Sequence, residues 1–340
     1  MVPPVAVLTA THERRQSLRR VLESLRHQSL PADAFRVVVV CDGCTDGTAD
    51  MVRSMSFPFD VTVIEQTPGR GPAAARNLGL AAVRSPIVVF IDDDVVPAAN
   101  LLEVHASRHE ERHDLIVIGP LLPPDRANQP WIRWEGDTLR KQYREMECGL
   151  WAPSPRQFYT GNASVRREHL SAVSGFDERL KRGEDVELAF RLQRRGLQFV
   201  FEPRAGATHF AHRSFHAWLG GAYEYGRAEL AMGPVAGTRG FVDVKAEDFQ
   251  RRSPIVRRLV LHGLAHPSIA PAVIMSGRIA GRTLTLAGLW RLARGAYTTI
   301  FELAYWRGVD RATGPSGSAL AILDAGRERA GVRRTSGAHR

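Results

Sequence analysis

Residues 87–94 read Ile-Val-Val-Phe-Ile-Asp-Asp-Asp, a short apolar run that ends in three adjacent acids. The run is apolar at every position, as expected for a strand that is buried on both faces of a parallel sheet. Three neighbouring carboxylates at the end of such a strand repel one another, and a divalent cation commonly offsets that repulsion. The alternative is a solvated turn that caps a helix, so the rest of the chain must separate the two.

Similar apolar runs recur through the first part of the chain, with helical patterns between them. Strands are predicted at Val5–Leu8, Phe35–Val40, Val61–Ile64, Ile87–Ile91 and Leu115–Ile118. Helices are predicted from the spacing of Leu18, Val21, Leu22 and Leu25 and at Ala73–Val83. Alternating strands and helices indicate right-handed crossovers and a mainly parallel α/β sheet flanked by helices.

Polar clusters follow three of these strands, at Thr9–Arg14, Asp42–Asp46 and Asp92–Asp94. Ligands of such sheets bind at the carboxyl ends of the strands. The convergence of the three clusters at one edge favours a binding site over a bare acidic turn.

A chain of 340 residues with 44% apolar residues allows one large domain with an appendage, or two domains. Three cysteines make no disulfide framework, so we interpret Cys41 and Cys44 as structural thiols in a reducing compartment. The N-terminus has no signal-peptide pattern, and no stretch is long and apolar enough for an ordinary membrane span. A cytoplasmic protein is therefore predicted.

The net charge of +10 is concentrated near the C-terminus. Residues 251–340 hold fifteen arginines, no lysine and four acids, a net charge of +11, which leaves −1 for residues 1–250. This argues against a nucleic-acid groove in the main domain. Leucines and tryptophans alternate with arginines in residues 254–308, a basic amphipathic pattern that predicts contact with an anionic membrane surface. Residues 311–340 are predicted to be partly disordered.

Residues 121–160 contain five prolines and three tryptophans and are predicted to be irregular. A long substrate-side loop and a surface excursion anchored by its aromatics both fit this composition. After it, a short helix is predicted at Glu168–Val173, a longer one at Asp185–Arg195 and a strand at Phe199–Phe201.

Several ordered motifs in about residues 4–215 resemble the family 2 nucleotide-sugar glycosyltransferases. They are Val7–Arg14, Val40–Thr48, Gly71–Gly79, the D-x-D acids Asp92–Asp94, Thr160–Arg167, Gly175–Glu178 and Gly183–Leu188. The resemblance implies the GT-A fold, a Rossmann-like mainly parallel sheet, here with a helical C-terminal extension. It implies a glycosyltransferase domain at 1–225, with a nucleotide-binding half at 1–120 and an acceptor half at 121–225. A basic helical extension at 226–310 and the tail at 311–340 follow.

The resemblance also implies an activity: inverting transfer of a hexose-type sugar from a nucleoside diphosphate, expected to be uridine diphosphate, to an acceptor hydroxyl. A carbohydrate or lipid-linked acceptor of the cell envelope would suit the basic tail. A divalent metal, Mn²⁺ or Mg²⁺, would stabilise the leaving diphosphate. Its predicted ligands are Asp94 and His209, with His212 as the alternative to His209.

The residues predicted to hold the nucleotide sugar are Ala10, Thr11, His12, Glu13, Asp42, Arg76, Asp92, Asp93, Gly161 and Asn162. Asp42 would accept a hydrogen bond from the base, or act only as a turn residue. Asp92 or Asp93 would hold the ribose, and for Asp92 the alternative is pairing with a nearby arginine. Arg76 would neutralise the diphosphate or pair with Asp42.

Asp185 matches the base of the family, with Glu184 beside it. A carboxylate at a helix N-terminus can take the acceptor proton, and helix capping is the alternative role. The chain departs from the family pattern at Ala10, His12 and Cys41, where proline, tyrosine and aspartate are usual. The His12 difference leaves the nucleotide base open.

Two other functions share parts of this pattern. A nucleotidyltransferase that makes sugar nucleotides would carry a Gly-rich basic loop after the first strand, and Thr9–Glu13 is not such a loop. A non-catalytic nucleotide-sugar binding module would be expected to lack Asp94 or Asp185, and both are present.

Overall fold

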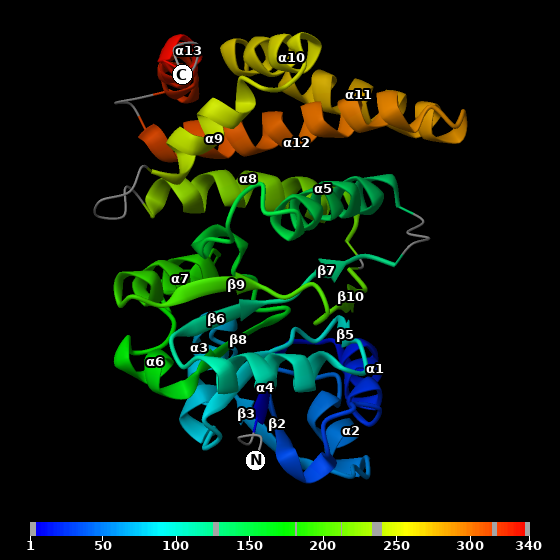
Figure 1. Cartoon of the computed structure of the whole chain (residues 1–340). Helices are drawn as coiled ribbons and strands as arrows, with labels where there is room; N and C mark the ends of the chain where they lie inside the picture. Colours follow the sequence, from blue (N-terminus) through cyan, green and yellow to red (C-terminus); the bar gives the residue numbers. More distant parts are fainter. Residues whose placement is uncertain are drawn as a thin grey trace. The chain divides into compact units, whose positions relative to one another are not determined.

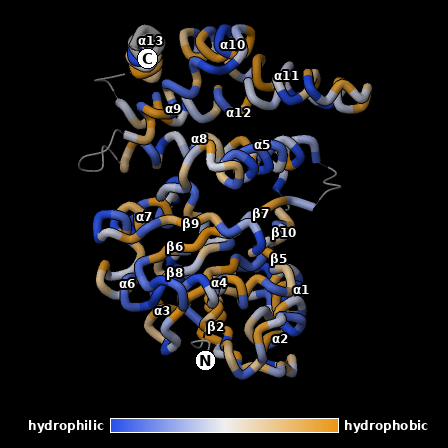
Figure 2. Tube along the Cα trace, in the orientation of Figure 1, coloured by the Kyte–Doolittle hydropathy of each residue, from blue (hydrophilic) through white to orange (hydrophobic). Residues whose placement is uncertain are grey.

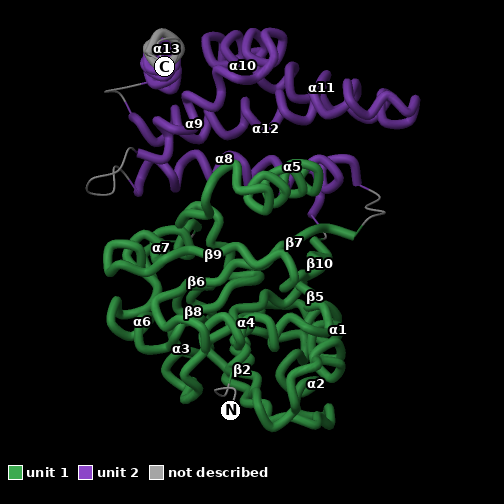
Figure 3. Tube along the Cα trace, viewed as in Figure 1, with its two compact units in different colours: residues 1–127, 135–211 green, residues 128–134, 212–340 purple. Residues whose placement is uncertain are grey.

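The computed structural model describes residues 5–124, 129–180, 182–211, 213–232, 240–314 and 318–336 (Figure 1). His212, the alternative metal ligand, lies outside them. The chain divides into two compact units, the first of residues 1–127 and 135–211 and the second of residues 128–134 and 212–340 (Figure 3). The predicted domain boundary at residue 225 falls inside helix α8 (Phe215–Ala231), and the division of the first unit into two halves stays a prediction.

The first unit alternates strands and helices, as the apolar pattern predicts. In chain order the elements up to residue 209 are β1 (Val5–Thr11), α1 (Arg15–Leu25), β2 (Phe35–Asp42), α2 (Thr48–Ser54), β3 (Asp60–Gln66), α3 (Pro72–Ala82), β4 (Ile87–Phe90), β5 (Val95–Pro97), α4 (Leu101–Glu111), β6 (Leu115–Ile118), β7 (Leu121–Leu122), α5 (Pro130–Glu147), β8 (Ala163–Arg166), α6 (Arg167–Ala172), α7 (Glu184–Arg194), β9 (Gln198–Phe201) and β10 (Ala207–His209). Residues 130–134 of α5 belong to the second unit. Short 3₁₀ turns lie at Ala32–Ala34 and Pro155–Gln157.

The main sheet has the strand order β3-β2-β1-β4-β8-β6-β9. Its strands are parallel except β8, which is antiparallel to both neighbours. Because β1 lies between β2 and β4, the carboxyl ends of these three strands meet at one edge. The predicted mainly parallel α/β sheet is therefore confirmed, while the insertion of β8 between β4 and β6 was not predicted.

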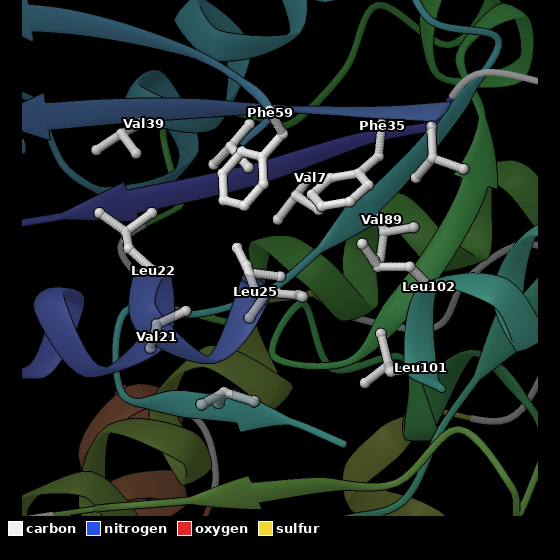
Figure 4. Packing of buried hydrophobic residues seen from close by; sticks show 14 of the residues in the cluster. Val7, Val21, Leu22, Leu25, Phe35, Val39, Phe59, Val89, Leu101 and Leu102 are labelled. Carbon is white, nitrogen blue, oxygen red and sulfur yellow. The ribbon is translucent and has the colours of Figure 1, made fainter. Parts of the chain in front are cut away.

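Buried apolar side chains cover both faces of the sheet. Figure 4 shows one side, where Leu22 and Leu25 of α1 pack near Phe35 of β2 and Val89 of β4. Burial of all four apolar positions predicted for α1 confirms that helix. The packing holds the strand ends in place, so the polar turns that follow them start from a rigid frame.

The prediction of an irregular segment at 121–160 was wrong, because residues 130–147 form the helix α5. The prolines lie outside the body of this helix: Pro130 is its first residue, where a missing N–H costs nothing. Ile132, Tyr143 and Met146 recur at helical spacing and are buried. Proline content therefore hid an ordinary amphipathic pattern.

The described part of the second unit is helical, which agrees with the predicted helical extension. Its helices are α8, α9 (Phe241–Phe249), α10 (Pro254–Ala265), α11 (Ala270–Leu286), α12 (Trp290–Thr313) and α13 (Ala319–Ser336). Tyr305, Trp306 and Val309 of α12 are central to its core. Helix α13 occupies most of the tail that was predicted to be partly disordered, and residues 315–317 and 337–340 lie outside the described part. No helix in the described ranges has the length and apolar character needed to cross a membrane.

Candidate active site

The acidic turn after β4 is held by residues from the end of β1. Thr11 Oγ1 donates a hydrogen bond of 2.7 Å to Asp93 Oδ2. Arg14 Nη1 lies 3.0 Å from Asp93 Oδ1 and 2.6 Å from Asp94 Oδ2. The repulsion inferred for the three acids is thus partly offset by the guanidinium of Arg14, a partner that the sequence alone does not reveal.

The two acids beside Arg14 differ in their proton affinity. Burial raises the pKa of Asp93 to about 6, against the opposing effects of Arg14 and Thr11. Burial also acts to raise the pKa of Asp94, but the hydrogen bond and charge of His209, together with Arg14, bring it down to about 2. Asp94 is therefore a carboxylate at neutral pH, as a metal ligand must be.

A second, three-stranded sheet of order β5-β10-β7 brings His209 to Asp94. His209 pairs with Val95 across the antiparallel β10–β5 ladder, and Phe210 N donates to Asp94 O at 2.8 Å. His209 Nε2 consequently lies 3.3 Å from Asp94 Oδ1. The two predicted ligands, 115 positions apart in sequence, are neighbours in space.

This pair fits a divalent cation that completes its shell with substrate oxygens. Two adjacent ligands at the roughly 2.1 Å preferred by Mg²⁺ lie about 3.0 Å apart, close to the observed separation. Across the described ranges no group of three or more His, Cys, Asp or Glu side chains is placed to hold a metal. Mg²⁺ commonly binds through one or two carboxylates plus phosphates and water, so Asp94 could supply the carboxylate ligand of such a cation.

Arg76 of α3 joins the acidic turn to helix α7. Its guanidinium is buried, with Nη2 2.9 Å from Asp92 Oδ1 and Nη1 2.8 Å from Glu184 Oε1. Of the predicted partners of Arg76, Asp42 is not used. The pairing of Asp92 with an arginine, one of the two interpretations of that acid, is confirmed.

Asp185 stands at the first turn of α7, beside Glu184. Gly183, at a φ of 74°, turns the chain into this helix in a conformation that favours glycine. Asp185 Oδ1 accepts a hydrogen bond of 2.8 Å from Val186 N. Burial and then the charge of Glu184 raise the pKa of Asp185 well above that of a free aspartate, while Arg76 opposes the shift. A carboxyl with a raised proton affinity is suited to accept a proton from a hydroxyl.

The loop after β2 is organised by Asp42. Its carboxylate accepts hydrogen bonds from Gln66 Nε2 at 2.6 Å, Arg70 N at 2.8 Å and Gly71 N at 2.8 Å. His12 Nδ1 lies 2.6 Å from the carbonyl oxygen of Asp42. The turn role considered for Asp42 is therefore present, and its contact with a nucleotide base stays a prediction.

Ala10 and Glu13 flank the same strand end. Ala10 is half-buried within β1 and can contribute only its backbone and methyl group. Glu13 Oε1 accepts hydrogen bonds from Thr45 N at 2.6 Å and Thr45 Oγ1 at 2.9 Å. Glu13 thus holds the turn after β2, and direct donor contact by either residue stays a prediction.

Gly161 and Asn162 have different surroundings. A Cβ on Gly161 would lie 3.3 Å from Asp92 Oδ2, so this glycine borders the site. Asn162 is buried, and its Nδ2 donates to Pro120 O at 3.0 Å and to Ala205 O at 2.7 Å. These bonds hold the segments before β7 and β10 and do not favour the predicted contact of Asn162 with the donor.

The cluster carries an excess of negative charge. Five carboxyl groups (Asp92, Asp93, Asp94, Glu184 and Asp185) face two guanidinium groups (Arg14 and Arg76), which gives −3 if all are ionised. The raised pKa values of Asp93 and Asp185 reflect this crowding as well as burial. A diphosphate would be repelled by such a cluster unless a cation accompanied it.

Residues 6–173 match the sequence model described as Glycosyl transferase family 2. This segment runs from β1 to just past α6 and contains the acidic turn with its two arginines. The chain belongs to glycosyl transferase family 2. The matched segment ends before Glu184, Asp185 and His209. Their association with the acidic turn in this family 2 chain is therefore inferred from their contacts in the structure.

Curated relatives are similar over much of the chain. A pre-mycofactocin glycosyltransferase of Mycobacterium tuberculosis is 30% identical over 227 residues, which is 65% of this chain and 46% of that protein. A validoxylamine A glucosyltransferase of Streptomyces hygroscopicus subsp. jinggangensis is 27% identical over 251 residues, 63% of this chain and 57% of that protein. This family 2 chain therefore spans about half the length of these relatives.

Solved structures share its fold. Mannosyltransferase PcManGT from Pyrobaculum calidifontis, in complex with GDP-Man and Mn²⁺, superposes with a TM-score of 0.59 at 22% identity, covering 90% of this chain and 87% of that one. S. aureus TarS 1-349 in complex with UDP gives a TM-score of 0.53 at 18% identity, covering 89% and 90%. Identities this low establish the fold alone, and the predicted GT-A architecture is confirmed.

Cys41, which departs from the family motif, and the nearby Cys44 are free thiols in this family 2 chain. Burial raises the pKa of Cys41 to about 12, and burial also raises the pKa of Cys44. Cys44 Sγ lies 3.5 Å from Thr11 O. Protonated, packed thiols agree with the structural role inferred from the sequence.

Proposed function

We propose that the protein is a metal-dependent inverting glycosyltransferase that moves a sugar from a nucleoside-diphosphate sugar to an acceptor hydroxyl. The observation that carries the proposal is the bridge through Arg76, which ties Asp92 of the acidic turn to Glu184 next to Asp185. The acidic turn, which would bind the cation, and the carboxyl group of Asp185, which would act as the base, thus belong to one cluster although they come from distant parts of the chain. Such a cluster combines the two requirements of sugar transfer, charge neutralisation and proton removal.

Asp94 and His209 would hold the divalent metal, Mn²⁺ or Mg²⁺, which when bound would neutralise charge developing on the leaving diphosphate. Arg14 contacts Asp94 and is half-exposed, so it can turn toward an anionic donor without leaving a buried site. Thr11 holds Asp93 in place. We assign Asp93 and Asp92 to the sugar-nucleotide hydroxyls, since their carboxylates are acceptors.

Asp185 would take the proton of the acceptor hydroxyl as that oxygen attacks the sugar. Glu184 is engaged with Arg76, whereas among the described residues Asp185 is held by the single bond from Val186. A single displacement with one base and no protein nucleophile inverts the configuration at the reacting carbon. We therefore assign Asp185 as the base and Glu184 as the residue that positions it through Arg76.

We propose a uridine diphosphate donor and a carbohydrate or lipid-linked acceptor of the cell envelope. The mannosyltransferase structure holds GDP-Man and the TarS structure holds UDP, so the shared fold accommodates both bases. His12, where the family usually has tyrosine, lies against the Asp42 loop and is the residue we expect to discriminate between them.

The test is a panel of UDP-, GDP- and dTDP-sugars, each with Mn²⁺, Mg²⁺ or EDTA, scored by release of the nucleoside diphosphate. Asp185→Asn should lower turnover by about 10²–10⁴-fold while nucleotide binding, measured by calorimetry, stays within about twofold. Asp60→Asn, an exposed acid on β3, is the matched control. If Asp185→Asn loses nucleotide binding together with turnover, Asp185 has a structural role. If the wild type binds the donors but turns over none of them, the protein is a binding module.

A further inference from the structure

Helix α11 of the second unit is attached to α12 through a narrow face of small residues. Of its 17 residues only Ala270 and Gly281 are buried. A Cβ on Gly281 would lie 2.8 Å from Tyr297 Cζ, and a Cβ on Gly277 would lie 3.0 Å from Ile300 Cγ1, so these glycines let the helices approach closely. Several large apolar side chains of α11 are consequently left exposed.

The uncovered apolar side chains form one stripe. Met275, Ile279 and Leu286 are 52%, 61% and 81% exposed. At 100° per residue these three positions fall within about 40° of one another around the helix, and Gly277 and Gly281 lie on the opposite side. A stripe that faces away from the packing contact has no structural partner among the described residues of the second unit.

The stripe continues into the turn between α11 and α12. We use the name hairpin tip for residues 286–294. Gly288, with a φ of 75°, reverses the chain there, and Leu289 and Leu292 are 50% and 61% exposed. Figure 1 shows α11 and α12 running side by side to this turn, and in Figure 2 hydrophobic and hydrophilic segments alternate along α11.

The charge around the hairpin tip has one sign. Residues 249–301 contain eight arginines and no acid. Arg282, Arg291 and Arg294 are exposed beside the leucines. Two further arginines pack on aromatic rings in the same region. The Cζ atom of Arg278 lies 4.4 Å from the ring centroid of Phe215, and that of Arg133 lies 4.1 Å from the ring centroid of Trp290. The exposed surface therefore combines large apolar side chains with clustered arginines.

We propose that the hairpin tip and the α11 stripe dock on a bilayer surface rich in anionic phospholipid. Leucines would enter the boundary between headgroups and acyl chains, and Arg282, Arg291 and Arg294 would contact lipid phosphates. Soluble surfaces rarely leave such apolar groups together in water. A nucleic-acid groove would explain the arginines but not the leucines, so the bilayer accounts for both. Docking does not depend on the transfer activity proposed above.

The experiment is co-sedimentation of the full chain with vesicles of phosphatidylcholine alone or with 30% phosphatidylglycerol. We expect at least tenfold tighter binding to the anionic vesicles and a several-fold loss at high salt. Leu286→Ser/Leu289→Ser/Leu292→Ser should weaken binding at least tenfold, as should Arg282→Gln/Arg291→Gln/Arg294→Gln. The matched controls are Leu150→Ser, an exposed leucine of the first unit, and Arg36→Gln/Arg84→Gln/Arg195→Gln.

Circular dichroism and thermal melting will check that each variant folds. The substituted side chains are exposed, so no loss of structure is expected. Equal binding of wild type and leucine variant, or equal binding to neutral and anionic vesicles, overturns the proposal. A third result would also overturn it. If the wild type does not bind vesicles but self-associates in sedimentation velocity, and the leucine variant does not self-associate, the surface joins two copies of the chain. Binding to RNA in preference to vesicles would assign the arginines to nucleic acid instead.

Discussion

Replacing the buried Arg76 by methionine tests the bridge on which the proposed function rests. Methionine has a similar length and leaves no large cavity, so the variant mainly removes one charge and two hydrogen bonds. The bonds lost are those of 2.8 Å to Glu184 and 2.9 Å to Asp92.

The two bonds should contribute unequally to stability. The side chain of Asp92 is 38% exposed, so water replaces its lost partner at a cost of at most about 1 kcal/mol. The side chain of Glu184 is only 10% exposed, and stranding a buried charge costs about 3–5 kcal/mol. We therefore expect Arg76→Met to lower the free energy of unfolding of the first unit by about 3–4 kcal/mol at pH 8. The loss should be smaller at pH 5, where the stranded carboxyl can take up a proton.

The measurement must report on the first unit alone, because a chain of two units need not unfold in one step. Native-state hydrogen exchange of peptides from β1, β2 and β4 serves this purpose. A loss of 3 kcal/mol corresponds to roughly 150-fold faster exchange. The double variant Arg76→Met/Glu184→Met removes both charges and should recover at least about 2 kcal/mol of the loss.

Two results would refute the reasoning. A loss below about 1 kcal/mol for Arg76→Met would show that Glu184 is not buried against a needed cation. If the loss in the free energy of unfolding of the double variant equals the sum of the losses of the two single variants, the residues do not interact.

The pH dependence of stability and the packing of Gly161 give further predictions. Burial lowers the pKa of His105 to about 4, below the 6.5 of a free histidine, so the unfolded chain binds more protons between those values. Stability from this residue is complete above pH 6.5 and lost as pH falls, by about 2 kcal/mol between pH 6.5 and 5. That loss should appear as the difference between wild type and His105→Gln in the same exchange experiment, and parallel pH profiles would contradict it. Gly161→Ala places a Cβ 2.9 Å from Leu121 Cδ2 and 3.3 Å from Asp92 Oδ2, so it should cost about 1 kcal/mol and lower turnover. Gly206→Ala meets no atom within 4 Å and should change neither, and equal effects of the two variants on turnover would show that Asp92 is not disturbed.

Much of the fold was predictable because its signals are local. Apolar runs of strand length and the spacing of Leu18, Val21, Leu22 and Leu25 each depend on a few consecutive residues. Polar residues directly after strands were likewise visible, which is why Asp42 and Asp94 were expected at one edge. Helix α5 was missed although its signal was also local, because prolines outside the helix body were weighed more heavily than the buried periodicity within it.

The amino-acid pattern alone indicates the alternation of strands and helices, the strand-end acids, and a basic C-terminal region with interleaved apolar residues. The contacts of Arg14 with Asp93 and Asp94, the bridge of Arg76 between Asp92 and Glu184, and the place of β8 between β4 and β6 are visible only in the folded chain. The two kinds of feature differ in the sequence separation of the residues that produce them. Periodicity and strand ends are properties of neighbouring residues, whereas the choice of partner for a buried charge depends on which strands lie side by side after the chain has folded.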